Sequence, residues 1–385
     1  MDSAEREELR PKGNVPNLRF PEFQGEWKEE RLADIADLYK GTGISKDQLS
    51  DDGEPCILYG ELYTKYKSET IREVISKTNI DNTKLVRSKA NDVIIPCSGE
   101  TAEDIATARC VLNGNILLGG DLNIIRLHGY DGAFMSYQLN GRRKYDIAKV
   151  AQGVSVVHLY GEHLKGVKTF NPCLEEQKKI AGLLALLDER IATQNKIIDK
   201  LQSLIKGLRV SLMQIENGNI VHLGEIAQIY QPQTISSTEL TEDGFLVYGA
   251  NGIIGKYKQY NHKTEQICIT CRGNTCGMVN YTKPMSWITG NAMVINTDEH
   301  QNKVCKRYLY HYLSAYNFNS IISGSGQPQI VRTPLEQLKV PLPTFLEQKQ
   351  KATFLDKIQG QIEISNKTLN LYLQQKQYLL RQMFI

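Results

Sequence analysis

The chain has 385 residues, 41% of them hydrophobic and 23% charged, which is the composition of a soluble globular protein with two or three domains. Its net charge of +3 excludes a strongly basic protein and makes nucleic-acid binding dependent on local positive charge. No run of 18 apolar residues exists, and residues 1–17 lack the apolar core of a signal peptide. With eight cysteines outside any disulfide-framework spacing, these features predict a cytoplasmic protein with free thiols.

The chain is expected to begin with a flexible polar tail over residues 1–17 and to become ordered from Leu18. Residues 27–39 then place Leu and Ile at three-residue steps before a Tyr, and residues 221–230 repeat this pattern. We interpret each segment as a short helical turn that leads into a strand.

Each opening segment is followed by a mixed, strand-rich region. The predicted strands are residues 56–59, 92–95, 116–118 and 123–127 in the first half and 245–248, 266–270, 277–281 and 292–295 in the second. One amphipathic helix is predicted in each region, at residues 132–141 and 306–315. Both regions end with a glycine turn, residues 151–159 and 324–332, and a short strand, residues 166–170 and 337–342.

Two long helices are predicted at residues 174–214 and 345–383, each about 60 Å long at 1.5 Å per residue. Their apolar residues recur at alternating three- and four-residue steps, which is the seam of a coiled coil. The seam positions are Leu184, Leu187, Ile191, Gln194, Ile198, Leu201, Ile205 and Leu208 in the first helix and, 171 residues later, Leu355, Ile358, Ile362, Ser365, Leu369, Tyr372 and Leu379 in the second. Lys376 interrupts the second seam, and its ammonium group is expected to extend out of the pair into solvent.

The in-register repeat indicates an internal duplication. The first helix leaves one domain and reaches the next, so a pseudo-twofold pairing makes the two helices antiparallel with a domain at each end. Gln194 and Ser365 would then meet near the middle and set the register at some cost in stability. The alternative, a helical hairpin inside one globular domain, is disfavoured by the 171 residues between the helices.

The predicted fold class is therefore α+β, with two tandem mixed α/β domains separated by an antiparallel coiled coil of two long helices. The expected boundaries are residues 18–170 for the first domain, 171–216 for the first helix, 217–341 for the second domain and 342–385 for the second helix.

The sequence contains no complete catalytic motif. Asn171-Pro172-Cys173-Leu174 is similar to the Asn-Pro-Pro-aromatic motif of adenine methyltransferases, but its last two residues differ and no glycine-rich cofactor loop precedes it. We interpret it as the turn that starts a helix. Cys268, Cys271 and Cys276 supply three of the four ligands of a structural zinc site, and a strand that carries cysteines is the favoured interpretation. We expect no catalytic residue and no metal in this chain.

Loops that mix aromatic, basic and amide side chains predict DNA contacts, because Lys reaches phosphates while Arg, Asn and Gln reach base edges. The candidate DNA-binding residues are Tyr63, Lys65, Lys67, Arg142, Arg143, Ser155, His158, Asn251, Lys256, Lys258, Arg272, Asn274, Gln327, Gln329 and Arg332. Each of them alone is typical of an ordinary solvated loop. Their recurrence near corresponding places in both halves is what favours a function.

Three motifs resemble those of the specificity subunit of a type I restriction–modification system. They are the repeated Leu-x-(Asp/Glu)-Ile-Ala openings, the Gly-Val-Ser-Val-Val-His-Leu closure at residues 153–159, and the two Pro-x-x-(Leu)-Glu-Gln-Lys helix starts. The resemblance extends from about Leu18 to the end of the chain, although the second closure, residues 324–330, matches less well.

The resemblance implies two target recognition domains, each reading one half of a bipartite double-stranded DNA sequence. It also implies assembly with two modification subunits, which bind S-adenosylmethionine and methylate adenine, and with restriction subunits that use ATP and Mg²⁺ to translocate and cleave DNA. This chain itself would carry no cofactor. The alternatives are an orphan DNA-binding or scaffold protein of the same duplicated fold that serves another assembly, and a self-contained methyltransferase or nuclease.

Overall fold

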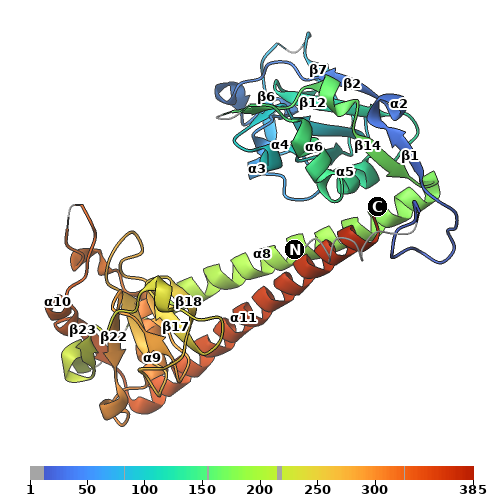
Figure 1. Cartoon of the computed structure of the whole chain (residues 1–385). Coiled ribbons are helices and arrows are strands. Elements are labelled where there is room, and N and C mark those ends of the chain that lie inside the picture. Colours follow the sequence, from blue (N-terminus) through green and yellow to red (C-terminus); the bar gives the residue numbers. More distant parts are fainter. Residues whose placement is uncertain (1–12, 82, 154–155, 215–218, 325) are drawn as a thin grey trace. The chain divides into compact units, whose positions relative to one another are not determined.

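The computed structural model describes residues 13–81, 83–153, 156–214, 219–324 and 326–385. The chain forms two compact units: unit 1 comprises residues 1–194 and 368–385, and unit 2 comprises residues 195–367. Each unit contains one globular α/β part and portions of two long helices, α8 (Leu174–Met213) and α11 (Phe345–Gln382) (Figure 1).

The globular part of unit 1 contains two five-stranded sheets. The first has the order β2 (Ala36–Lys40), β12 (Leu122–Leu127), β8 (Asp92–Pro96), β10 (Arg109–Val111) and β5 (Thr70–Ile71). The second has the order β3 (Leu49–Ser50), β6 (Ser76–Thr78), β4 (Glu54–Ile57), β11 (Leu117–Leu118) and β7 (Val86–Arg87). Two separate pairs are β1 (Lys28–Arg31) with β14 (Lys168–Asn171) and β9 (Ser98–Gly99) with β13 (Val157–His158).

Short helices connect these strands. They are α2 (Leu32–Ile35), α3 (Glu61–Thr64), α4 (Ala102–Ile105), α5 (Gly132–Asn140), α6 (Lys144–Val150), α7 (Gly161–Leu164) and the 3₁₀ turn η1 (Lys46–Gln48). Helix α5 is the one that joins the sheet to α8: Met135 and Leu139 pack into the core of the first sheet, whereas Phe134 and Tyr137 pack against Leu184. Its side chains on opposite faces are therefore both buried.

The globular part of unit 2 is smaller. A four-stranded sheet has the order β16 (Gln228–Tyr230), β22 (Ala292–Asn296), β19 (Ile267–Thr270) and β20 (Val279–Tyr281), and a three-stranded sheet has the order β18 (Gly252–Tyr257), β17 (Phe245–Gly249) and β21 (Trp287–Ile288). β15 (Asn219–His222) pairs with β23 (Lys339–Leu342). The helical segments are α9 (Lys306–Ala315), α10 (Arg332–Glu336) and the 3₁₀ turns η2 (Leu223–Glu225), η3 (Ser237–Glu239), η4 (Asp298–His300) and η5 (Phe318–Ser320).

The two globular parts share a frame, as the duplication predicts. The antiparallel order β2-β12-β8 in unit 1 recurs as β16-β22-β19 in unit 2, and the pair β1–β14 recurs as β15–β23. The predicted turn-then-strand openings are confirmed as α2 followed by β2 and η2 followed by β16. Strand β18 was not predicted; it forms a hairpin with β17 through Gly249 and Gly252, and Gly252 supplies the positive φ of 94°.

The glutamine of the repeated Glu-Gln-Lys helix start has the same structural role in both units. In unit 1 the Gln177 amide donates to the Pro172 carbonyl (2.8 Å) and accepts from the backbone N–H of Asp131, the N-cap of α5 (2.9 Å). In unit 2 Gln348 repeats both contacts, with Pro343 (3.0 Å) and with Cys305, the residue preceding α9 (2.8 Å). The motif therefore ties the start of each long helix to the helix of its own globular part.

The long helices run antiparallel, which confirms the predicted pairing. Within unit 2, Lys351 of α11 donates to the Leu212 carbonyl of α8, and Arg209 of α8 donates to Gln359 of α11 (3.3 Å). Residue numbers therefore rise along one helix as they fall along its partner. The predicted seam positions are buried or half-buried in both helices, from Leu184 and Leu187 in unit 1 to Leu355 and Ile362 in unit 2.

The expectation that Lys376 extends into solvent is wrong. Its ammonium group lies 2.6 Å from Asp188 Oδ1 and 2.5 Å from Glu69 Oε2, and its side chain is only 13% exposed. Asp188 also accepts hydrogen bonds from the hydroxyls of Ser68 (2.9 Å) and Tyr137 (2.8 Å). A side chain that looked like a flaw in the seam is thus the cation of a buried polar network that joins the first globular part to both long helices.

Of the predicted N-terminal tail, residues 1–12 lie outside the described part of the chain. Within residues 13–17, the Asn14 carbonyl accepts from the backbone N–H of Trp27 (2.7 Å), so the chain is held in place before Leu18. Among the described residues, every helix is too short or too polar to cross a bilayer.

Candidate nucleic-acid interface

The glycine turn that ends each region is closed by the same two backbone hydrogen bonds in both units. In unit 1 Gln152 and His158 exchange two backbone hydrogen bonds (2.8 and 2.7 Å), and in unit 2 Ser323 and Gln329 do the same (2.9 and 2.8 Å). We call the turns closed by Gln152 and His158 and by Ser323 and Gln329 the closure turns. Although the second matches the sequence motif less well, its backbone hydrogen bonds are the same.

Each closure turn begins at a glycine that no other residue could replace without strain. Gly153 has φ of 120° and Gly324 has φ of 95°. A Cβ atom on Gly153 would lie 2.1 Å from the Val156 carbonyl oxygen, and one on Gly324 would lie 2.4 Å from that of Gln327. The glycine is therefore required both by its backbone conformation and by the close approach of the turn.

A second repeated segment lies beside each closure turn and was missed in the sequence. Cys97-Ser98-Gly99 follows β8, and Cys271-Arg272-Gly273 follows β19. The Cys97 carbonyl accepts from Leu159 N–H (2.8 Å), and the Cys271 carbonyl accepts from Ile330 N–H (3.0 Å). The shared Cys-x-Gly-x-Thr pattern could have revealed this repeat, but its offset of 174 residues differs from those of the openings and of the long helices.

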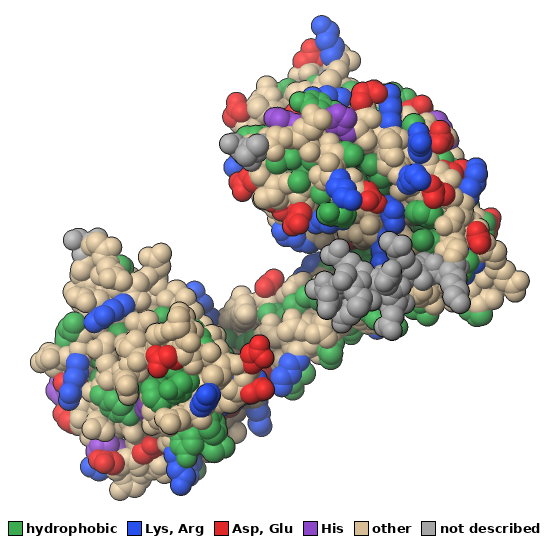
Figure 2. All heavy atoms as spheres, viewed as in Figure 1, with side chains coloured by type: hydrophobic (Ala, Val, Ile, Leu, Met, Phe, Trp, Pro, Cys, Tyr) green, Lys and Arg blue, Asp and Glu red, His purple; other side chains and the backbone are tan. Residues whose placement is uncertain are grey.

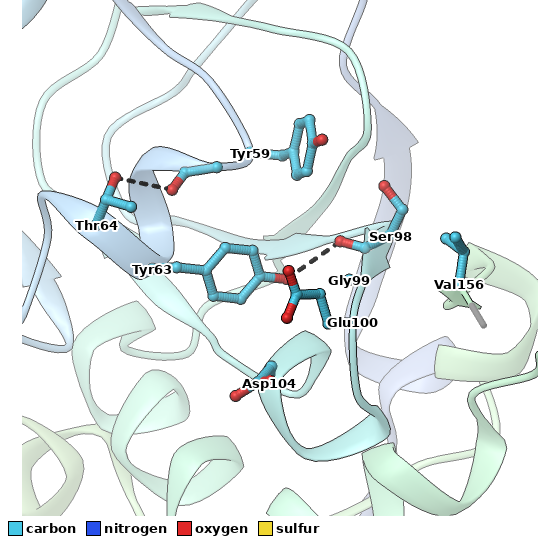
Figure 3. A pocket seen from close by; sticks show the side chains of 9 residues that line it. Tyr59, Tyr63, Thr64, Ser98, Gly99, Glu100, Asp104 and Val156 are labelled. Atoms are coloured by element: carbon cyan, nitrogen blue, oxygen red, sulfur yellow. Dashed lines mark hydrogen bonds between the residues drawn. The ribbon is translucent and has the colours of Figure 1, made fainter. Parts of the chain in front are cut away.

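In unit 1 this segment borders a cavity of about 620 Å³ (Figure 3). Its lining residues are Tyr59, Gly60, Tyr63, Thr64, Ser98, Gly99, Glu100, Asp104 and Val156. The Tyr63 hydroxyl donates to the Ser98 carbonyl (3.2 Å), and burial, followed by the nearby Asp104 carboxylate, raises the pKa of Tyr63. The cavity thus combines two aromatic rings with two carboxylates, a surface suited to amino groups on planar rings.

In unit 2 the equivalent segment borders a cavity of about 370 Å³. Its lining residues are Tyr230, Gln231, Arg272, Met293, Gln329, Ile330, Val331 and Arg332. The structure therefore brings together three of the predicted DNA-binding residues, Arg272, Gln329 and Arg332. Arg332 Nε donates to Glu336 (2.6 Å), whereas within the described part of the chain the exposed Arg272 guanidinium has no hydrogen-bond or salt-bridge partner.

Both halves of the chain, with their repeated surfaces, match one known protein family. A family model described as the type I restriction modification DNA specificity domain matches the chain twice, over residues 24–203 and 216–373. The chain belongs to this family. Each specificity domain, in the sense of this match, comprises one globular part and most of the long helix that follows it.

Relatives of similar length support this membership. The type I restriction enzyme MjaVIII specificity subunit of Methanocaldococcus jannaschii is 25% identical over 397 residues, covering 91% of this chain and 89% of that protein. The EcoprrI specificity subunit of Escherichia coli is 32% identical over 140 residues, covering 35% of this chain and 34% of its own length.

Solved structures share the fold. The type I restriction–modification S subunit from M. genitalium has a TM-score of 0.71 at 18% identity and covers 96% of this chain and 99% of its own. A chain from a structure described as the basis of complex assembly and conformational transition of the type I system has a TM-score of 0.53 at 16% identity, covering 93% and 97%.

Of the other predicted DNA-binding residues of the first specificity domain, the two lysines have partners within the protein. Lys65 Nζ donates to Ser76 Oγ (2.6 Å), and Lys67 Nζ donates to the Tyr63 carbonyl (2.7 Å). His158 is exposed beside Tyr160, with ring centroids 6.1 Å apart. Ser155 lies outside the described residues.

Arg142 and Arg143 are placed against the C-terminal end of α11. Arg142 donates to the Arg381 carbonyl (2.6 Å), and Arg143 donates to the Ile385 carbonyl (2.7 Å). Burial and the adjacent positive charges of Arg143 and Arg381 lower the pKa of Arg142. The pair therefore anchors the end of the chain to α5 and α6, a role that the loop-like sequence did not indicate.

In the second specificity domain the remaining candidates are dispersed. Asn251 accepts from the Thr275 hydroxyl (2.5 Å), Lys256 lies 3.5 Å from Asp243, and Lys258, Asn274 and Gln327 are exposed. Whether any of them contacts DNA stays a prediction.

The structure also places the cysteine cluster and the Asn171-Pro172-Cys173-Leu174 segment. Cys268 is buried in β19, where burial raises the pKa of its thiol to about 12, and within the described residues no three His, Cys, Asp or Glu side chains group as a metal site. Asn171 is buried and donates to Thr169 Oγ1 (3.0 Å) and Glu30 Oε2 (3.2 Å), consistent with the turn that starts α8.

Charge is unevenly distributed on the visible surface. Figure 2 shows Lys and Arg side chains interspersed with Asp and Glu on the globular part of unit 1, and a mostly uncharged face on the globular part of unit 2. On these faces, nucleic-acid contacts would depend on individual side chains rather than on one basic patch.

Proposed function

We propose that this chain is the DNA sequence-recognition subunit of a type I restriction–modification complex. Each specificity domain reads one half of a bipartite target, and partner subunits methylate adenine at N6 and cleave the DNA. The observation that carries this proposal is the occurrence of the DNA specificity domain twice in one chain, each time with a long helix. A bipartite target needs two readers, and this chain supplies two.

The long helices suit a measuring role. Helix α8 has 40 residues, which corresponds to about 60 Å at 1.5 Å per residue. B-DNA makes one turn in about 34–36 Å. A pair of helices that long can separate two half-sites by a fixed number of unread base pairs.

The outer surface of the helix pair suits partner subunits. In unit 1 Leu186 of α8 and Leu371 and Tyr378 of α11 are 60%, 63% and 52% exposed. In unit 2 Leu204 of α8 and Phe354 of α11 are each 49% exposed. Each of these residues immediately precedes a seam position of its own helix, so within each unit the exposed apolar side chains of α8 and α11 flank the seam on the same side.

Exposed apolar side chains in such an arrangement mark a protein interface. We assign this surface to two modification subunits, one for each half of the duplicated chain. Those subunits would bind S-adenosylmethionine, and restriction subunits would use ATP and Mg²⁺, so this chain would itself be non-catalytic.

The test is to map adenine methylation in host cells with and without this gene. A bipartite motif that loses methylation on deletion is the expected result. The purified chain should methylate nothing alone and should direct methylation to that motif when modification subunits are added. If deletion leaves the methylome unchanged, or if the chain alone transfers methyl groups, the proposed function is wrong.

A further inference from the structure

In both specificity domains one pair of residues joins the segment after the central strand to the closure turn. In the first domain Ser98 pairs with His158, and in the second Arg272 pairs with Gln329. We call each pair a closure bridge. The two bridges occupy the same place, because the Cys residue before Ser98 or Arg272 makes the same backbone hydrogen bonds in both domains: Cys97 with Asp121 and Leu159, and Cys271 with Asn291 and Ile330.

The closure bridge presents different side chains from one common frame. Successive residues of an extended chain point to opposite faces. Cys97 and Leu159 are buried in the first domain, as Cys271 and Ile330 are in the second. The bridge residues between them point outward: His158, Arg272 and Gln329 are exposed, and Ser98 is half-buried.

The contrast between the two bridges is informative. The inward residues are alike in size and polarity, Cys with Cys and Leu with Ile, whereas the outward residues change from Ser and His to Arg and Gln. Packing constrains the buried side chains in both domains, while the exposed side chains are free to differ. One frame can therefore present different side chains to two different half-sites.

A cavity lies beside each bridge. Ser98 borders the cavity of about 620 Å³ in the first domain, and Arg272 and Gln329 border the cavity of about 370 Å³ in the second. The backbone of the first bridge is the two-stranded pair β9–β13, and that of the second is a single antiparallel β-bridge. A two-stranded ribbon is of a size that the major groove of B-DNA admits.

We propose that the closure bridge is the base-reading element of each specificity domain, and that in the second domain Arg272 reads a guanine and Gln329 an adjacent adenine. An arginine fork donates to guanine O6 and N7, and a glutamine amide pairs with adenine N6 and N7. Cross-strand neighbours have Cβ atoms about 5 Å apart, and the rise along one DNA strand is 3.4 Å, so both side chains reach neighbouring bases.

The state of the nearby arginines supports this assignment. Arg332 is held by Glu336 at 2.6 Å. Among the described residues, no carboxylate competes for the exposed Arg272 guanidinium. Its donors are therefore accessible to a ligand outside the protein, and a guanine edge would satisfy them in the plane of the fork. This inference rests on the proposed function, since it concerns which bases the second domain reads.

The experiment uses the full chain with its modification subunits to methylate a random-sequence DNA library, which is then sequenced. The key variant is Arg272→Ser, because the first domain already holds a serine at this position of the same frame, and Gln329→His is its companion. We expect Arg272→Ser to reduce the preference for guanine at one position of one half-site by roughly 10- to 100-fold. Gln329→His should act on adenine at the neighbouring position, and the other half-site should stay unchanged in both variants.

Lys339→Ala is the charge-matched control, because Lys339 is an exposed residue of β23 in the same domain. It should leave both half-sites intact. An unchanged motif in Arg272→Ser would overturn the inference. So would a uniform loss of methylation with an unchanged motif, because that result would make Arg272 a phosphate contact. If the wild-type complex itself methylates no bipartite motif, it is the proposed function that fails.

Discussion

Lys376 offers the sharpest test of how the first globular part is attached to the long helices. Its ammonium group lies between Glu69, which is 10% exposed, and Asp188, which is 8% exposed. Replacing Lys376 by Met keeps the approximate length of the side chain but removes the ammonium group between the two carboxylates, which leaves the guanidinium of Arg109 as a nearby cation. Removing one partner of a buried ion pair costs about 3–5 kcal/mol, because the remaining charge is uncompensated.

We therefore expect Lys376→Met to lower the free energy of unfolding of unit 1 by about 3–5 kcal/mol. The chain contains two tryptophans, and Trp27 is 1% exposed with its ring 5.6 Å from that of Phe134. In a Trp287→Phe background, urea unfolding followed by Trp27 fluorescence reports unit 1 alone.

Two controls accompany this variant. Lys178→Met removes an exposed lysine of α8 within unit 1 and should change stability by less than about 0.5 kcal/mol. Adding Glu69→Gln and Asp188→Asn to Lys376→Met removes both carboxylate charges and should recover part of the loss, because Arg109 then lacks its two anionic neighbours. A loss below about 1 kcal/mol in Lys376→Met would refute the reasoning, because it would mean that water screens Lys376 as it does in surface ion pairs.

Three further predictions follow from the other features. Inserting four residues beside Gln194 lengthens α8 by about 6 Å and should change the number of unread base pairs in the methylated motif; an unchanged spacer would contradict the measuring role. Burial lowers the pKa of His311. Its Nδ1 accepts a hydrogen bond from Arg209 of α8 (3.1 Å), and its Nε2 lies 2.8 Å from a carboxylate oxygen of Asp356 of α11. Arg307 of α9 donates to the same carboxylate. Because the folded state resists protonation of His311, the stability of unit 2 should fall as the pH drops below about 6.5, and His311→Gln should flatten that fall in unfolding curves followed by Trp287 in a Trp27→Phe background; equal slopes would exclude His311 as the cause. Gly153→Ala should cost roughly 1–3 kcal/mol and weaken binding to one half-site in fluorescence anisotropy, whereas Gly182→Ala in α8, where a Cβ atom meets nothing within 4 Å, should preserve binding; equal affinities for the two variants would mean that the first closure turn is not needed for recognition.

The predictable part of the candidate interface was the set of residues whose side-chain type alone indicates base contacts. Arg272, Gln329 and Arg332 were selected as side chains able to reach bases, and the structure brings all three to one cavity. Arg142 and Arg143 belong to the same residue type, yet they bind the carbonyls of Arg381 and Ile385. Whether an arginine faces solvent or binds another segment of the chain depends on contacts with residues that are far away in the sequence.

The sequence by itself determined the duplication, the two long antiparallel helices and about half of the described strands, because each depends on a periodicity that a linear chain displays. Seam residues recur at three- and four-residue steps, and a duplicated pattern recurs at a constant offset. Only the tertiary structure decided the rest. Lys376 interrupts the apolar seam in the sequence, and only the fold brings Glu69, 307 residues away, beside it. The closure bridge shows no periodicity in the sequence because its two paired residues come from distant segments.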